Sequence, residues 1–147
     1  MDVIGAVLPS RNGTVARLAP IAAGGAIGAA GVYVALADPA RAGSRFPICS
    51  FHQLTGLWCP GCGLTRGMHE LLTGNVVGAL GLNLFVPIVV VAIVGGWWIW
   101  LRRSLGHPSP QWLAAIPRWL PQVAVALVVA YGVLRNVPVA PFTALAP

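Results

Sequence analysis

The chain has 147 residues, of which 57% are hydrophobic and only 8% are charged, and its mean hydropathy is +0.80. These values argue against an ordinary soluble domain. They predict an all-α integral membrane protein that forms a single domain over residues 1–147. The net charge of +6 comes from arginines that stand singly or in pairs beside apolar runs. Because membrane-flanking charges fall at such places, no nucleic-acid partner is expected.

The first apolar stretch covers residues 18–37 without a charge. That length makes about 30 Å of helix, enough to cross a bilayer. Gly24, Gly28 and Gly31 fall on or near one helix face at the spacing that lets a second helix approach closely. We therefore expect lipid and a membrane-protein partner to contact this segment. A signal peptide cleaved after Ala37 is the alternative, although the stretch is long for one.

The Cys/His motif region, residues 49–83, follows a polar connector. Within it, residues 64–73 predict a short helix with one apolar and one polar face, which Gly74 ends. Its length of about 15 Å is half a bilayer, so the helix is expected to lie at the membrane interface or to be re-entrant. If residues 76–81 continued this helix, the whole segment would form an additional span.

Two further spans are predicted at about residues 84–101 and 119–134. The first of them ends in a cluster of tryptophans followed by Arg102 and Arg103, which is typical of a membrane–water interface. The expected fold class is therefore a polytopic membrane helix bundle with three transmembrane helices, or four in the alternative, plus the short helix.

The arginine distribution favours an N-terminus on the inner side of the membrane. Five arginines would then lie inside and four outside: Arg11, Arg17, Arg102, Arg103 and Arg118 inside, and Arg41, Arg45, Arg66 and Arg135 outside. The short loop after the second span counts most. The two sides differ by one arginine. In this orientation the Cys/His region lies on the extracytoplasmic side.

All the cysteines lie in one short region of an otherwise apolar chain. Cys49-x2-His52 and Cys59-x2-Cys62 are two pairs at the spacing with which neighbouring ligands bind one metal ion. Zinc prefers four thiolate or imidazole ligands, so the pattern predicts a metal site with zinc as the expected ion. His69, one or two helical turns beyond Cys62, is a second candidate for the imidazole.

The same cysteine pair also fits thiol–disulfide redox chemistry. A Cys-x-x-Cys at a helix start has its first thiol, here Cys59, activated by backbone N–H groups. Arg66, one turn after Cys62, could stabilise a thiolate or bind a quinone oxygen. Membrane thiol oxidases of the disulfide-bond-forming type resemble this local arrangement, but they usually carry a second cysteine pair, whereas Cys49 is alone. The purely structural alternative is a static disulfide with one buried free thiol, or three free thiols that serve as small apolar groups.

The motif resembles the bacterial membrane-protein family known as domain of unknown function DUF2752. The matching elements are Cys49, Leu54-Thr55-Gly56, Cys59-Pro60-Gly61-Cys62-Gly63-Leu64-Thr65-Arg66, His69, Leu71-Leu72, Gly74 and Asn83. Family members often have proline at the positions that Ser50 and Leu84 occupy here. The resemblance implies a small multi-pass protein of the bacterial cell membrane and supplies no activity.

His52 is outside this family pattern, so the resemblance favours His69. The expected ligand set is Cys49, Cys59, Cys62 and His69. The leading hypothesis is a membrane protein in which this cluster binds a metal in an accessory or structural role. A thiol–disulfide oxidoreductase that uses Cys59, Cys62 and Arg66 with quinone or a partner disulfide is the alternative. A third hypothesis, based on the glycine face, is a scaffold subunit of a membrane complex.

Overall fold

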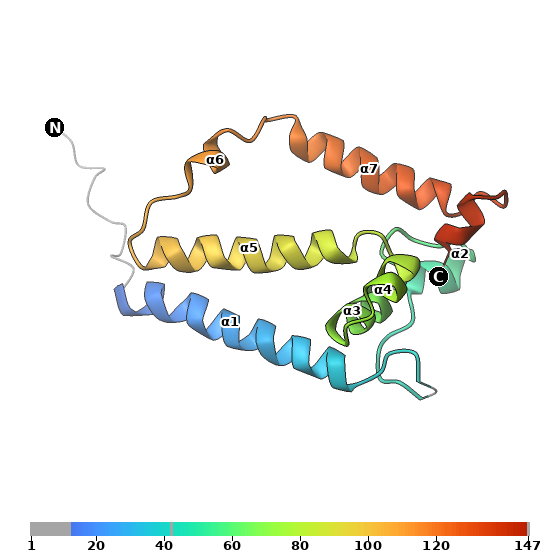
Figure 1. The fold of residues 1–147 in the computed structure, drawn as a ribbon, viewed down its shortest axis with the longest axis horizontal. Helices are drawn as coiled ribbons and strands as arrows, with labels where there is room; N and C mark the ends of the chain where they lie inside the picture. Colours follow the sequence, from blue (N-terminus) through green and yellow to red (C-terminus); the bar gives the residue numbers. More distant parts are fainter. Residues whose placement is uncertain (1–12, 42, 147) are drawn as a thin grey trace.

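The computed structural model describes residues 13–41 and 43–146, and within them the chain is helical without strands (Figure 1). The elements are α1 (Gly13–Leu36), α2 (Ser50–Thr55), α3 (Leu64–Leu72), α4 (Val76–Leu82), α5 (Val86–Ser104), α6 (Gln111–Ala114), α7 (Leu120–Leu134) and the 3-10 helix η1 (Phe142–Leu145). The all-α class predicted from the sequence is confirmed.

The three longest helices, α1, α5 and α7, run in similar directions across Figure 1. The short helices α2, α3 and α4 gather with η1 at one end of them, whereas α6 lies in the connection at the opposite end. The chain reaches the end that carries α2, α3 and α4 from α1, leaves it through α5 and returns to it through α7. The Cys/His region therefore lies at the end of the molecule where α1 and α7 finish and α5 begins.

Two helical segments, Arg17–Leu36 and Val86–Ser104, are long and apolar enough to cross a membrane. Only 6% of each apolar window is buried inside the molecule, which is unlike the core helix of a soluble protein. The expected third span corresponds to α7, which is apolar but has 15 residues. Its length of about 22 Å falls short of the ~30 Å hydrocarbon layer. The structure thus gives two candidate spans where three were predicted.

The alternative of an additional span is wrong, because α3 and α4 are separate helices that pack against each other. Gly74 follows α3 with a φ of +95°, in the left-handed region that only glycine adopts at little cost. Asn75 then caps α4 by accepting a 3.0 Å hydrogen bond from the backbone N–H of Gly78. The chain reverses here instead of continuing across a membrane.

The close approach of α3 to its neighbours depends on Gly67, which is buried. A Cβ atom at this position would lie 2.7 Å from Val86 Cγ2 and 3.1 Å from the carbonyl oxygen of Ala79. Glycine therefore lets α3 contact both α4 and the start of α5. This packing fixes the turn before α3 relative to the long helices.

Part of the glycine face of α1 is used within the chain. A Cβ atom on Gly24 would lie 2.5 Å from Trp97 Cζ2, and Trp97 Nε1 donates a 2.8 Å hydrogen bond to the carbonyl oxygen of Pro20. Gly24 therefore serves the packing of α1 on α5. Gly28 and Gly31 face open space, with no atom within 4 Å of an added Cβ among the described residues.

Candidate metal centre

The cysteines come from two short segments that the local sequence shapes into a cap and a turn. Cys49 is the N-cap residue of α2 and has an extended backbone conformation. Cys59 and Cys62 belong to a turn closed by a 3.0 Å hydrogen bond from the Cys62 N–H to the Cys59 carbonyl. Gly63 follows at the N-cap of α3 with a φ of +80°, which explains the glycine after Cys62.

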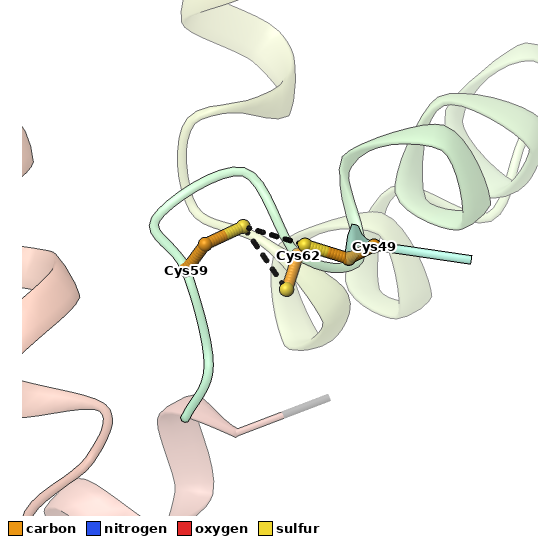
Figure 2. A group of neighbouring side chains, drawn as sticks. All are labelled: Cys49, Cys59 and Cys62. Atoms are coloured by element: carbon orange, nitrogen blue, oxygen red, sulfur yellow. Dashed lines mark hydrogen bonds between the residues drawn. The ribbon is translucent and has the colours of Figure 1, made fainter. Parts of the chain in front are cut away.

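The three sulfur atoms converge within 4.8 Å of one another, and Figure 2 shows Cys59 facing both of its neighbours. Cys59 Sγ lies 3.4 Å from Cys49 Sγ and 3.0 Å from Cys62 Sγ. Sulfurs around a tetrahedral zinc ion at ~2.3 Å are about 3.8 Å apart, whereas a disulfide bond is about 2.05 Å long. The three side chains are free thiols, and together they could hold a metal ion.

The thiols of Cys49 and Cys62 differ in their pKa. The backbone N–H of His52 at the start of α2 and the nearby Cys59 thiol lower the pKa of the Cys49 thiol from 9.0 to about 7. Burial raises the pKa of the Cys62 thiol from 9.0 to about 12, and the Cys59 side chain adds to this effect. Negative charge is therefore carried readily on Cys49, where the sequence had indicated Cys59 as the activated thiol.

The carbonyl groups of the cysteine turn are held by Asn83, which is fully buried between α4 and α5. Its Nδ2 donates hydrogen bonds to the carbonyl oxygens of Pro60 at 2.9 Å and Cys62 at 3.0 Å. Its Oδ1 accepts a 2.9 Å hydrogen bond from the backbone N–H of Phe85. One side chain thus ties the turn to the start of α5.

Arg135, directly after α7, supports the same turn and is only 2% exposed. Its Nη1 donates to the carbonyl oxygens of Cys59 and Cys62, both at 3.0 Å. The guanidinium also lies 5.0 Å from the centroid of the Tyr131 ring, within cation–π distance. Its Nε and Nη2 are buried without a hydrogen-bond partner among the described residues. A buried positive charge therefore lies directly behind the cysteine turn.

A second contact joins the end of α7 to the residue before the turn. The Asn136 side chain accepts a 2.7 Å hydrogen bond from the Trp58 N–H and donates a 2.8 Å bond to the Trp58 carbonyl. Gly132 makes room for Pro60, whose Cδ would lie 3.2 Å from an added Cβ. The C-terminal end of α7 is therefore a docking surface for the cysteine turn.

The predicted imidazole ligands lie in different places. His69 Nδ1 is 2.8 Å from the Val34 carbonyl oxygen, so the side chain joins α3 to α1, and His69 is not among the residues whose ligand atoms converge. His52 borders a cavity beside the cluster together with Arg66. Of the expected ligand set, the structure brings together the three cysteines and leaves His69 apart.

Sequence reasoning missed the roles of Arg135, Asn83 and Asn136. Arg135 had been interpreted as a charge flanking a span, which is the usual place of an arginine after an apolar helix. The available signal was the Arg-Asn pair that directly follows α7 in a chain with few charged residues. Buried polar groups in such a chain mark functional positions.

The fold and the site define an all-helical protein with two candidate membrane spans and a three-cysteine cluster. Residues 49–98 match the family model described as Protein of unknown function (DUF2752), which confirms the family assignment that the cysteine motif had suggested. No match was found among curated proteins or among solved structures. The matched segment contains the cysteines and Asn83, whereas Arg135 and Asn136 lie outside it.

Proposed function

We propose that this protein is a multi-pass membrane protein in which Cys49, Cys59 and Cys62 bind one zinc ion in an accessory or structural role. The observation that carries this proposal is the convergence of three sulfurs within 4.8 Å from two separate segments. Zinc is the ion that sulfur ligands in tetrahedral arrangement favour, and the cluster provides most of such a set.

The buried charge of Arg135 supports an anionic centre at this position. A buried guanidinium is costly unless negative charge compensates it. The hydrogen bonds of Arg135 go to the carbonyl groups of Cys59 and Cys62, which are neutral. A zinc ion with three thiolates carries a net negative charge and would supply the compensation. The buried positive charge of Arg135 beside the cysteine turn thus favours a cluster that holds a metal ion.

The exposure of the apolar helices supports membrane insertion. Residues 120–130 of α7 are all exposed, and most of the apolar residues of α1 and α5 are also exposed. Contacts of α1 with α5 and α3 favour its retention as an anchor over its removal as a signal peptide. We expect quantitative retention in the membrane after a carbonate wash, and full release into the supernatant would contradict membrane insertion.

The burial of Arg135 also supports an N-terminus inside. Without Arg135, the arginines expected outside are Arg41, Arg45 and Arg66, against five inside. The difference in the number of arginines between the two sides is then larger. The positive-inside effect accordingly favours the extracytoplasmic side for the cysteine cluster. Gly28 and Gly31, which remain open, are the part of the α1 face that could receive a partner helix in a membrane complex.

The zinc proposal is tested by metal analysis of full-length protein purified anaerobically in detergent. We expect close to one zinc per chain in the native protein and loss of most of it in Cys59→Ser and Cys62→Ser, because each variant removes a thiolate ligand. His107→Ala, outside the cluster, is the control and should keep its zinc. Unchanged zinc in the Cys59→Ser/Cys62→Ser double variant would reject the proposal.

A thiol–disulfide oxidoreductase is the second candidate function. It is favoured by the 3.4 Å distance between Cys49 Sγ and Cys59 Sγ and by the lowered pKa of Cys49. The Cys49 thiolate would attack a partner disulfide and release one partner thiolate. Cys59, as a thiolate, would then displace the second partner thiolate and form a Cys49–Cys59 disulfide. No contact in the described part of the structure favours quinone as the co-substrate.

Thiol counting distinguishes the two functions. Metal-free protein is incubated with glutathione disulfide, and the remaining thiols are counted by alkylation and mass spectrometry. The redox function requires loss of two thiols with formation of an internal disulfide. Retention of all three free thiols would reject it, with Cys49→Ser as the control for the attacking thiol.

A further inference from the structure

A cavity of about 360 Å³ adjoins the cysteine cluster. Cys49 and Cys62 line it together with His52, Trp58, Thr65 and Arg66. The described residues that line the cavity include no aspartate or glutamate. The arginine is therefore the charged group with which a ligand in this cavity would pair.

The three cysteines leave one ligand position of a tetrahedral ion to another group. No imidazole or carboxylate among the described residues converges with the three sulfurs. Zinc sites with three protein ligands typically keep the fourth position for a water molecule or a substrate, whereas closed structural sites have four protein ligands. Because two of the cysteines border the cavity, a ligand held there lies beside the ion.

The hydrogen bonding of His52 determines which ring nitrogen can accept a hydrogen bond. His52 Nδ1 lies 3.1 Å from the carbonyl oxygen of Leu57, and a carbonyl oxygen can only accept. The proton of the neutral ring is therefore on Nδ1, and Nε2 carries the lone pair. Stacking on Trp58, with ring centroids 3.9 Å apart, holds the ring in this orientation. The wall of the cavity thus carries a hydrogen-bond acceptor on His52 as well as the Arg66 donor.

We propose that this cavity binds a small thiol that carries a carboxylate, with its sulfur as the fourth ligand of the metal and its carboxylate paired with Arg66. The inference rests on the zinc function proposed above. On binding, the S–H bond of the ligand breaks, its sulfur bonds to the metal, and the proton is released to water. The anionic centre and the carboxylate then lie beside the positive charges of Arg66 and Arg135, which compensate most of the negative charge.

The test uses full-length protein in detergent loaded with Co²⁺, whose visible absorption reports the ligands of the ion. Three probes separate the two parts of the ligand: thioglycolate has both groups, 2-mercaptoethanol lacks the carboxylate, and acetate lacks the thiol. We expect thioglycolate to change the spectrum at the lowest concentration. Arg66→Gln should weaken thioglycolate binding by about tenfold, as loss of a charge-assisted pair predicts, and leave 2-mercaptoethanol binding nearly unchanged.

Arg103→Gln, an exposed arginine at the far end of α5, is the matched control and should bind thioglycolate as the native protein does. A Co²⁺ spectrum that no probe changes would overturn the inference while the metal site stands. Equal weakening of thioglycolate and 2-mercaptoethanol in Arg66→Gln would overturn the carboxylate pairing. If His52→Ala changes the Co²⁺ spectrum before any probe is added, His52 is the fourth ligand of the ion, and the inference of an open ligand position is overturned. Failure to bind Co²⁺ at all would reject the proposed function itself.

Discussion

The guanidinium of Arg135 donates a 3.0 Å hydrogen bond to the carbonyl oxygen of Cys62, a residue 73 positions earlier in the chain. This bond connects the end of α7 to the turn that carries two of the three cysteines. Because α7 contacts the rest of the molecule mainly at this end, Arg135 couples the docking of the helix to the geometry of the cluster. The side chain thus has a structural and an electrostatic role at once.

Arg135→Gln should lower the stability of the protein and weaken metal retention. The variant loses charge-assisted hydrogen bonds to the carbonyl groups of Cys59 and Cys62 and the positive charge behind the cluster, a loss of about 3 kcal/mol in the free energy of unfolding. Thermal unfolding in detergent and zinc retention against a chelator measure the two effects. Arg118→Gln, at an exposed position before α7, is the control. Native-like values in both assays would show that Arg135 does not support the site.

Asn83→Ala should destabilise the protein more than Asn75→Ala. Asn83 is fully buried, and its removal leaves the Phe85 N–H without its partner and takes the shorter of two hydrogen bonds from the Pro60 carbonyl, at a cost of about 2 kcal/mol. Asn75 is an exposed helix cap, whose loss costs about 1 kcal/mol. Thermal unfolding of the two variants gives the comparison. A larger loss in Asn75→Ala would contradict the assigned role of Asn83.

Local features of the sequence predicted where the three long helices lie along the chain. The predicted stretches at 18–37, 84–101 and 119–134 correspond to α1, α5 and α7, because apolar runs with Gly, Pro and Arg at their ends are local signals. The six-residue helix α2 was not predicted, since so short an element leaves no periodic pattern. The bounds of α7 agree with the predicted stretch to within one residue, but at 15 residues the helix is too short to count among the candidate spans.

The cysteine cluster could be predicted because Cys59 and Cys62 have the spacing that a single turn imposes, and Cys49 is close to them in sequence. The fourth ligand could not be predicted in this way. His69 lies one or two helical turns beyond Cys62, but the direction of its side chain depends on how α3 packs, and α3 presents it to the Val34 carbonyl of α1. The role of Arg135 likewise depends on tertiary docking, which no local pattern records.

Gly67→Ala should lower the melting temperature, whereas Gly81→Ala should not. An added Cβ at position 67 would lie 2.7 Å from Val86 Cγ2 and would force α3 away from α4 and α5, at a cost of about 2 kcal/mol. Position 81 has no atom within 4 Å of an added Cβ, and alanine is the better helix former. Equal melting temperatures for the two variants would contradict the close packing of α3.

The stability of metal-free protein should depend on pH through its thiols. The folded protein lowers the pKa of Cys49 from 9.0 to about 7, so this stabilisation is present above pH 9 and is lost as the pH falls towards 7. Burial raises the pKa of Cys62 to about 12, so its contribution is present below pH 9 and is lost as the pH rises towards 12. The melting temperature should therefore be highest near pH 9.

Cys49→Ser is the control for the expected rise in melting temperature between pH 7 and 9. In this variant the rise should be absent. Alkylation rates measured against pH report the same group directly, because the thiolate is the reactive form. In metal-free protein we expect a rapidly alkylated thiol with an apparent pKa near 7, assigned to Cys49 by peptide mapping. Rapid alkylation at another cysteine, with Cys49 unreactive at neutral pH, would contradict the role of the α2 N-terminus.

The most direct test of the proposed metal centre is X-ray absorption at the zinc edge of anaerobically purified full-length protein. The three converging sulfurs predict at least three zinc–sulfur distances of about 2.3 Å, and Cys49→Ser should remove one of them. An added small thiol should raise the sulfur count by one in the native protein. A zinc ion surrounded by nitrogen and oxygen alone, or a protein that retains no zinc, would contradict the assignment of the cysteine cluster as a metal site.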